Sequence, residues 1–335
     1  MLKPRVAVVN SKSFGVYTDA IERLSALCEV VRLEVPKDIG GAELASKLRG
    51  FHFVVASVTP RYSREFFEQN DSVVMIVRHG IGYDNIDVAA AEEFGVVIAR
   101  VPGWREREAV AEHAVALALD ALRHVSRSYN YVRAGRWGER AKFIGKELPS
   151  LTIGVIGFGN IGSRAAEIFR RGFGARVVVY DPYVPPEKIR ELGCEPVKNL
   201  EDLLKQADII TLHTALTPET YHMISREEFE LMKDGVILVN TARGELIDEQ
   251  ALIEYLRKGK IAAVALDVVE GEPIGADHPL LKFENIIITP HIAAYTVEAL
   301  KGMDEAVVEA IVNYLNGKPI DGLVVLPKKQ RKLVT

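Results

Sequence analysis

Three glycines in the segment GVIGFGNIG have the spacing G-x-G-x-x-G and stand at Gly157, Gly159 and Gly162. An apolar run precedes them and a stretch of helical character follows, so they occupy a predicted turn between strand and helix. In such a turn the first glycine permits a tight bend, the second lets a pyrophosphate approach the backbone, and the third lets helix and strand pack closely. The free N–H groups at the start of the helix attract phosphates. The motif therefore predicts a dinucleotide-binding site.

An acidic residue, Asp181, follows in VVVYDPY at the end of the next predicted strand. A carboxylate at this place accepts hydrogen bonds from the ribose hydroxyls of NAD and would repel the 2′-phosphate of NADP. A glycine-rich turn followed by an unrelated acid is the alternative interpretation, and it leaves the order of strand, turn, helix, strand and acid unexplained. We predict NAD as the cofactor.

Three groups suited to carbonyl chemistry come after later predicted strands: Arg243 in NTARG, Glu272 in GEP and His291 in TPHIA. An arginine fork anchors a carboxylate and polarises a carbonyl, and a histidine can donate a proton near neutral pH. A carboxylate beside that histidine favours its charged form and fixes the ring. Each residue alone has an ordinary structural explanation, as a helix cap, a loop carboxylate or a structural histidine. Together, behind a dinucleotide motif, they predict hydride transfer between a nicotinamide and a 2-keto or 2-hydroxy acid.

The elements that position these residues form two series of alternating strands and helices. Strand-like apolar runs are predicted at 6–9, 30–35, 53–58, 73–77 and 96–101, and then at 152–156, 176–180, 209–213, 236–240, 261–269 and 286–289. Between the series, residues 106–135 have the pattern of one long helix, and a last helix is predicted at 297–315. Such alternation is typical of doubly wound, mostly parallel sheets. Two such domains in series predict a cleft in which cofactor and substrate meet.

The composition is that of an ordinary globular protein, with 48% hydrophobic and 26% charged residues. The formal net charge of −4 offers no basic surplus, so we expect no nucleic-acid partner. Basic residues gather only near the C-terminus, at Lys328, Lys329, Arg331 and Lys332, where we expect a solvated tail. No apolar stretch approaches the length of a membrane helix, and the N-terminus has the pattern of a strand and not of a signal peptide.

The two cysteines, Cys28 and Cys194, are far apart in the sequence, and no ligand spacing links them to histidines. They cannot build a disulfide framework, and we expect neither a metal site nor a disulfide. Reduced thiols and the absence of a targeting segment favour a cytoplasmic protein.

The chain resembles the D-isomer-specific 2-hydroxy acid dehydrogenase family over nearly its whole length. The segments that carry the resemblance are RHGIGYDNID, VAEHAVALAL, GVIGFGNIG, NTARG, ALDV-x-x-GEP and TPHIA. The resemblance implies two Rossmann-like or flavodoxin-like domains with doubly wound parallel sheets. A discontinuous substrate-binding domain would comprise residues 1–102 and 294–335, and an NAD-binding domain residues 103–293.

The resemblance also implies residue roles. Arg243 would bind the substrate, His291 and Glu272 would form the acid/base pair, and Asp267 would contact the nicotinamide carboxamide. The implied cofactor-binding residues are Gly157, Gly159, Asn160, Ile161, Gly162, Asp181, Thr214, Thr241, Ala242, Asp267 and His291. The implied substrate-binding residues are Val58, His79, Gly80, Ile81, Gly82, Arg243 and His291, with the backbone of 79–82 holding the substrate carboxylate. This last role makes physical sense, because Gly80 and Gly82 permit the unusual backbone of an anion-binding nest.

The chain departs from the family pattern at a few places. The segment WRERE after Gly103 is one residue longer and lacks the usual polar residue, and Ala215 stands where proline is usual. The loop 57–59 lacks the arginine of phosphoglycerate-type members, and Ala294 replaces an aromatic residue. These last two features favour a 2-keto acid with an uncharged substituent, such as glyoxylate, hydroxypyruvate or pyruvate, over a phosphorylated one. A phosphoglycerate dehydrogenase-type activity, formate or phosphite oxidation, and a non-enzymatic NAD-sensing corepressor are the alternatives.

A homodimer is predicted from residues 109–122, AVAEHAVALALDAL, which are apolar nearly all round. A helix on the outside of one domain has a single apolar stripe, so this helix should be buried on more than one side. The same helix of a second subunit would cover it in a two-fold contact, and the resemblance also favours dimerisation through the NAD domain. A helix wedged between the two domains of one chain is the alternative.

Overall fold

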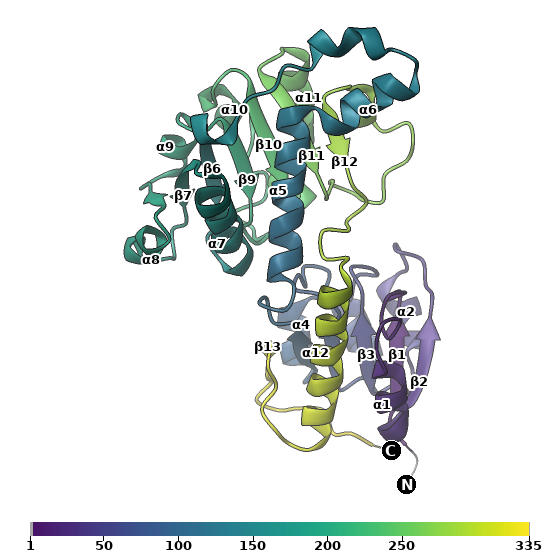
Figure 1. Ribbon diagram of the computed structural model, residues 1–335. Coiled ribbons are helices and arrows are strands. Elements are labelled where there is room, and N and C mark those ends of the chain that lie inside the picture. Colours follow the sequence, from purple (N-terminus) through teal and green to yellow (C-terminus); the bar gives the residue numbers. More distant parts are fainter. Residues whose placement is uncertain (1–2, 335) are drawn as a thin grey trace. The chain divides into compact units, whose positions relative to one another are not determined.

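The computed structural model describes residues 3–334 (Figure 1). Two compact units divide these residues: the first extends to Glu106 and resumes at Tyr295, and the second is Arg107–Ala294. Each unit is an α/β domain built on its own mostly parallel sheet, which confirms the predicted fold class. The assignment of substrate to the first unit and NAD to the second stays a prediction.

The first unit contains a six-stranded sheet in the order β13-β5-β4-β3-β1-β2. The strands are β1 (Arg5–Val9), β2 (Glu29–Leu33), β3 (Phe53–Ala56), β4 (Met75–Arg78), β5 (Val97–Arg100) and β13 (Leu323–Val325), and the helices are α1 (Ala20–Leu27), α2 (Gly41–Lys47), α3 (Arg64–Gln69), α4 (Val88–Glu93) and α12 (Val297–Leu315). β1 to β5 run parallel in the flavodoxin-like order, and β13 pairs antiparallel with β5. α1 and α12 cover one face, and α2, α3 and α4 the other. The central strands are therefore buried on both faces, which is why they read as continuous apolar runs.

The second unit contains a seven-stranded parallel sheet in the order β12-β11-β10-β9-β6-β7-β8. Its strands are β6 (Thr152–Ile156), β7 (Arg176–Tyr180), β8 (Glu195–Pro196), β9 (Ile209–Leu212), β10 (Val236–Asn240), β11 (Ile261–Leu266) and β12 (Ile286–Ile288). Its α-helices are α5 (Arg107–Arg123), α6 (Val125–Arg133), α7 (Asn160–Glu167), α8 (Pro186–Glu191), α9 (Leu200–Leu204), α10 (Arg226–Leu231) and α11 (Glu249–Arg257). α5, α7 and α8 pack on one face, and α9, α10 and α11 on the other. The chain moves outward in both directions from β6, so a topological switch point lies between β6 and β9, where such sheets bind ligands.

The prediction of a single long helix at 106–135 is wrong. The chain forms two helices there, α5 and α6, with a break at His124. His124 adopts a left-handed conformation with φ of +56°, which ends one helix and redirects the next. The connection after α6 contains short 3-10 turns, η1 (Trp137–Lys142) and η2 (Leu148–Ser150).

Most of the apolar surface of α5 is buried inside the second unit. Nine of its side chains are buried, and the six from Ala114 to Leu122 belong to the core on the face of the sheet that α5 covers. The burial of this part of the helix requires no second subunit.

Lys328, Lys329 and Lys332 of the C-terminal segment are exposed, as predicted, but Arg331 is bound to the first unit. Arg331 donates hydrogen bonds to the backbone carbonyls of Phe67 (2.8 Å), Val73 (3.1 Å) and Phe94 (2.7 Å). Its own amide donates to Gly95 O at 2.8 Å. A guanidinium carries five donors in a fixed fork, so one arginine can satisfy several carbonyls and fasten the tail to the first unit.

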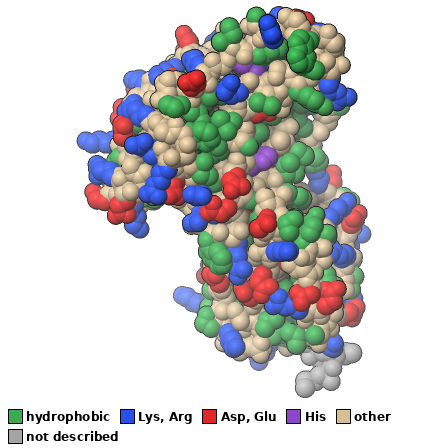
Figure 2. Space-filling model, viewed as in Figure 1, with side chains coloured by type: hydrophobic (Ala, Val, Ile, Leu, Met, Phe, Trp, Pro, Cys, Tyr) green, Lys and Arg blue, Asp and Glu red, His purple; other side chains and the backbone are tan. Residues whose placement is uncertain are grey.

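Acidic and basic side chains are interspersed over the face of the molecule that Figure 2 presents. Among the described residues, no helix is long and apolar enough to cross a membrane. Within the same residues, no group of three or more histidine, cysteine or acidic side chains has an arrangement suited to a metal ion. Both cysteines are buried thiols.

Candidate active site

The predicted residues of the second unit follow the carboxyl ends of six parallel strands. Gly157 follows β6, Asp181 follows β7, Thr214 follows β9, Thr241, Ala242 and Arg243 follow β10, Asp267 follows β11, and His291 follows β12. Parallel strands end at the same edge of a sheet, so these residues lie along one edge of the second unit.

The glycine turn has the geometry of a phosphate-binding loop. Gly157 is buried with φ of +90°, and a Cβ on it would lie 2.8 Å from the backbone of His213 and Thr214. A Cβ on Gly162 would lie 2.0 Å from Gly157 O, so neither position admits a side chain. Gly159, by contrast, is exposed with open space around it, and α7 begins directly after it without a side-chain cap. The first amides of α7 are therefore available to an anion, and the turn fits a pyrophosphate.

Asp181 joins the end of β7 to the glycine turn. Its Oδ2 accepts a hydrogen bond from the Phe158 amide at 2.7 Å. Its Oδ1 accepts from the amides of Tyr183 (2.8 Å) and Val184 (3.1 Å). The carboxylate is partly exposed and rigidly oriented, and it retains acceptor capacity for a diol.

His291 and Glu272 are in direct contact through Nδ1 of the imidazole and Oε1 of the carboxylate. Because a carboxylate only accepts, Nδ1 carries the proton and Nε2 is left for another partner. Glu272 Oε2 also accepts from the Val269 amide at 3.2 Å. About one third of each side chain is exposed, 32% for His291 and 34% for Glu272. The pair can therefore meet a ligand while keeping a fixed orientation.

Asp267 organises the loop that carries His291. Its buried carboxylate accepts hydrogen bonds from the Thr289 hydroxyl (2.6 Å) and from the amides of Ile292 and Ala293 (2.8 Å each). Burial raises the pKa of Asp267, but hydrogen bonds from His113, Thr289 and these two amides outweigh it and leave the pKa below its ordinary value. His291 itself has φ of +55°, a conformation that a non-glycine residue adopts only when its surroundings impose it.

The sequence did not predict that His113 of α5 takes part in this network. His113 Nε2 lies 3.0 Å from Thr289 Oγ1 and 3.5 Å from Asp267 Oδ1. The only signal for it was a histidine that interrupts an apolar helix. Its contact ties α5 to the loop that carries His291.

Buried Asn240 shapes the turn that presents Arg243. Asn240 Oδ1 accepts from the Ala242 amide at 2.9 Å, and Nδ2 donates to Arg243 O at 2.6 Å. A Cβ on Gly244 would lie 2.2 Å from the backbone of Val269 and Glu270. The turn after β10 therefore packs tightly against the loop that leads to Glu272, and a glycine after Arg243 is required.

In the first unit, His79, Gly80, Ile81 and Gly82 form the loop after β4. The His79 amide donates to Ala56 O at 2.9 Å, and Gly80 O accepts from the Val101 amide at 3.1 Å. Within residues 3–334, no acceptor contacts the amides of Ile81 and Gly82. Gly80 has φ of +142°, and a Cβ on it would lie 2.6 Å from the Arg78 guanidinium. Two consecutive amides without acceptors make this loop a candidate anion nest.

Val58 lies in the loop after β3 and is 40% exposed.

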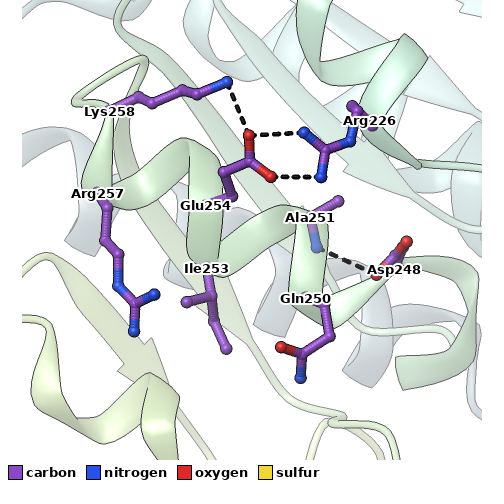
Figure 3. A pocket seen from close by; sticks show the side chains of 8 residues that line it. All are labelled: Arg226, Asp248, Gln250, Ala251, Ile253, Glu254, Arg257 and Lys258. Carbon is purple, nitrogen blue, oxygen red and sulfur yellow. Dashed lines mark hydrogen bonds and ion pairs between the residues drawn. The ribbon is translucent and has the colours of Figure 1, made fainter.

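A separate cavity of about 500 Å³ lies at α10 and α11 of the second unit and contains none of the predicted residues. Figure 3 shows Glu254 at its centre, bound to Arg226 on one side and to Lys258 on the other. Asp248 is engaged as the N-cap of α11, where it accepts from the Ala251 amide at 3.1 Å. Most of the charges around this cavity are therefore neutralised by their neighbours.

Residues 115–293 match the family model described as "D-isomer specific 2-hydroxyacid dehydrogenase, NAD binding domain". A D-3-phosphoglycerate dehydrogenase of Methanocaldococcus jannaschii is 41% identical over 318 residues, which cover 95% of this chain and 59% of the relative. The chain thus spans less than two thirds of that protein. A glyoxylate reductase of Aeropyrum pernix is 37% identical over 330 residues, which cover 97% of this chain and 96% of the relative.

Among solved structures, a D-lactate dehydrogenase from Aquifex aeolicus complexed with NAD and lactic acid has a TM-score of 0.85 and 30% identity. The superposition covers 96% of this chain and all of the other chain.

Proposed function

The chain belongs to the D-isomer-specific 2-hydroxyacid dehydrogenase family, and from this premise we propose that it is an NAD-dependent oxidoreductase that interconverts a small 2-keto acid and its D-2-hydroxy acid. The observation that carries the proposal is the His291–Glu272 pair on the edge of the sheet that also bears the glycine turn. NADH, when bound, supplies the hydride. The chain must then supply a proton, a cation for the carboxylate and a site that orients both.

In the proposed reaction His291 Nε2–H gives its proton to the carbonyl oxygen. Glu272 holds the ring through Nδ1 and stabilises the charged imidazolium. Arg243 binds the keto acid and polarises its carbonyl, and the amides of Ile81 and Gly82 donate hydrogen bonds to the carboxylate. In the reverse direction the same imidazole takes the proton from the hydroxyl, because one group must serve both directions at equilibrium.

The proposed NAD site uses the edge of the second unit. The glycine turn would hold the pyrophosphate and Asp181 the ribose hydroxyls. The residues assigned to the cofactor are Gly157, Gly159, Asn160, Ile161, Gly162, Asp181, Thr214, Thr241, Ala242, Asp267 and His291. Asp267 serves the nicotinamide carboxamide in this proposal, in addition to the hydrogen bonds that hold the His291 loop.

We favour a 2-keto acid whose substituent is uncharged, because Ser57, Val58 and Thr59 in the loop after β3 offer no cation to a phosphate. A second candidate, 3-phosphoglycerate oxidation, is favoured by the 41% identity to an archaeal phosphoglycerate dehydrogenase. The experiment that tests the function is NADH oxidation against glyoxylate, hydroxypyruvate, pyruvate and phosphohydroxypyruvate. Turnover of an unphosphorylated acid supports the proposal, and a clear preference for phosphohydroxypyruvate supports the second candidate. Failure with every 2-keto acid would reject both.

Asp181 leads to a prediction about the cofactor. We expect kcat/KM to be higher with NADH than with NADPH, because the 2′-phosphate would meet a carboxylate already fixed by three backbone amides. Asp181→Ser should bring the two kcat/KM values closer together. The variant loses the carboxylate that binds the ribose hydroxyls of NADH, and it no longer repels the 2′-phosphate of NADPH. Kinetics with both cofactors check this, and equal or better kcat/KM with NADPH in the unaltered protein would contradict it.

We also propose that the protein is a homodimer whose contact includes α6 and the segment that follows it. Exposed apolar side chains gather there, and hydrophobic surface is visible over this region at the top of Figure 2. They are Val125 (58% exposed), Tyr129 (59%), Val132 (47%), Trp137 (70%) and Ile144 (83%). Apolar clusters of this kind on a globular surface mark contact sites, and homo-oligomers most often have two-fold symmetry.

Light scattering coupled to size exclusion tests the dimer. Two chains of 37.1 kDa give an expected mass of about 74 kDa. The double variant Tyr129→Glu/Trp137→Glu should shift the mass toward one chain, because two carboxylates would be buried in the contact. Tyr183→Glu is the matched control, since that tyrosine is 91% exposed elsewhere in the same unit and should leave the dimer intact. A single-chain mass for the unaltered protein across a dilution series would reject the proposal.

A further inference from the structure

Three segments of the first unit meet at one fully buried carboxylate. Asp304 of α12 has no exposed surface, and its Oδ1 lies 3.0 Å from His79 Nε2. Its Oδ2 accepts hydrogen bonds from the Gly15 amide (3.0 Å) and from the Thr18 hydroxyl (2.6 Å). One side chain of α12 therefore binds both the loop after β1 and the loop after β4.

The His79 ring is held on both sides. Its Nδ1 lies 2.7 Å from Ser11 Oγ, and its edge packs against the Phe14 ring at a centroid distance of 5.4 Å. Because a carboxylate cannot donate, Nε2 carries a proton toward Asp304, and Nδ1 of the neutral ring accepts from Ser11. Burial lowers the pKa of His79, and the hydrogen bond that the ring donates to Asp304 opposes that effect only in part, so the ring is neutral at neutral pH.

The charges packed around the ring come from separate elements. Asp304 faces it from α12, Arg78 from the end of β4 and Arg32 from β2. Arg32 donates to Ser11 O at 3.0 Å and also binds Phe14 O, so it fastens the loop after β1. An isolated buried carboxylate would be strongly destabilising, whereas Asp304 has three hydrogen-bond donors: the His79 ring, the Gly15 amide and the Thr18 hydroxyl.

This network ends at the loop assigned to the substrate carboxylate. His79 directly precedes Gly80, and the two amides without acceptors belong to the next two residues, Ile81 and Gly82. His79 is fixed by its amide, by its carbonyl, which accepts from Arg78, and by both ring nitrogens. Nothing in the proposed reaction uses the His79 ring. The two hydrogen bonds of the ring therefore have a different purpose.

We propose that Asp304 is a positioning residue for substrate binding: it holds the His79 ring and thereby sets the direction of the Ile81 and Gly82 amides. This inference rests on the proposed function, because those amides are the groups assigned to the substrate carboxylate. The same carboxylate couples the loop after β1 to the substrate loop, so both should loosen together when it is altered. A nest binds an anion only while its amides converge, and small displacements of such groups are costly.

The test is Asp304→Asn, which keeps the size of the side chain but removes the charge that three donors share. We expect KM for the best 2-keto acid to rise about tenfold, the equivalent of one hydrogen bond to a charged group, while kcat and KM for NADH stay the same. Glu305→Gln is the matched control, because it breaks an exposed ion pair with Arg23 at the next position of α12 and should change none of these constants. An unchanged KM for the keto acid, or an equal rise for NADH, would overturn the proposal.

Hydrogen exchange measured on the intact protein separates this inference from the proposed function. Peptides covering 11–19 and 75–83 should exchange faster in Asp304→Asn and at the original rate in Glu305→Gln; unchanged exchange in Asp304→Asn would overturn the positioning role. If the unaltered protein reduced no 2-keto acid, the proposed function would fall while the exchange data still decided the coupling. Should Asp304→Asn fail to fold, Ser11→Ala removes only the hydroxyl on Nδ1, and the same two readouts should change in the same direction.

Discussion

Replacing His291 with alanine should lower kcat for 2-keto acid reduction by roughly 10²- to 10⁴-fold, the usual effect of losing a positioned acid. The physical reason is the orientation of the ring. Glu272 occupies Nδ1, and Asp267 holds the amides of Ile292 and Ala293, so Nε2 is the one ring position left to give a proton. Water in place of the imidazole would be neither as acidic nor fixed at the carbonyl oxygen.

The measurement is steady-state turnover combined with a fluorescence titration of NADH. NADH affinity should remain close to that of the unaltered protein, because the imidazole serves the substrate oxygen. His278→Ala is a matched control: its Nε2 lies 3.4 Å from Glu249 Oε1, so it removes a histidine with a carboxylate partner from the same unit but outside the site. Near-normal kcat in His291→Ala would mean that another group supplies the proton.

The sequence predicted which residues follow the strand ends of the second unit, because the signals for that placement are local. Each motif joins an apolar strand to the polar residue directly after it, and parallel topology then aligns the strand ends without further information. The glycine turn is the clearest case. The spacing predicts a tight bend at Gly157, room for a pyrophosphate at Gly159 and close packing at Gly162, and a Cβ would clash at the first and third positions but not at the second. The fold class followed from the alternation of strands and helices for the same reason.

Contacts between distant segments could not be predicted in this way. His79 and Asp304 are 225 positions apart, and nothing in either local sequence indicates the other. Arg331 belongs to a run of basic residues that is typical of a solvated tail, yet it binds three carbonyls of the first unit. The break at His124 depends on one left-handed residue, a backbone choice that hydrophobic periodicity does not encode.

Replacing Arg243 with lysine should lower kcat/KM for the 2-keto acid by about 10²-fold or more, although the positive charge is kept. Removing one donor aimed at developing negative charge has an effect of this size. A guanidinium offers paired N–H groups in one plane that match a carboxylate, whereas an ammonium is a compact point charge on a flexible stem. Arg243 also donates from Nη1 to Ala242 O at 2.7 Å, a contact that preorganises the fork on the turn held by Asn240.

Steady-state kinetics with the best keto acid check this prediction, and NADH affinity serves as the second readout. Arg226→Lys is the matched control, because that arginine pairs with Glu254 at the separate cavity and should leave kcat/KM unchanged. If Arg243 acted only through its charge, the lysine variant would keep most of the activity, and the bidentate role would have to be abandoned. A loss of kcat/KM in Arg243→Lys with unchanged NADH affinity would instead show that the planar geometry of the guanidinium serves the substrate. The positive charge and the cofactor binding are both preserved in that variant, so neither could explain the loss.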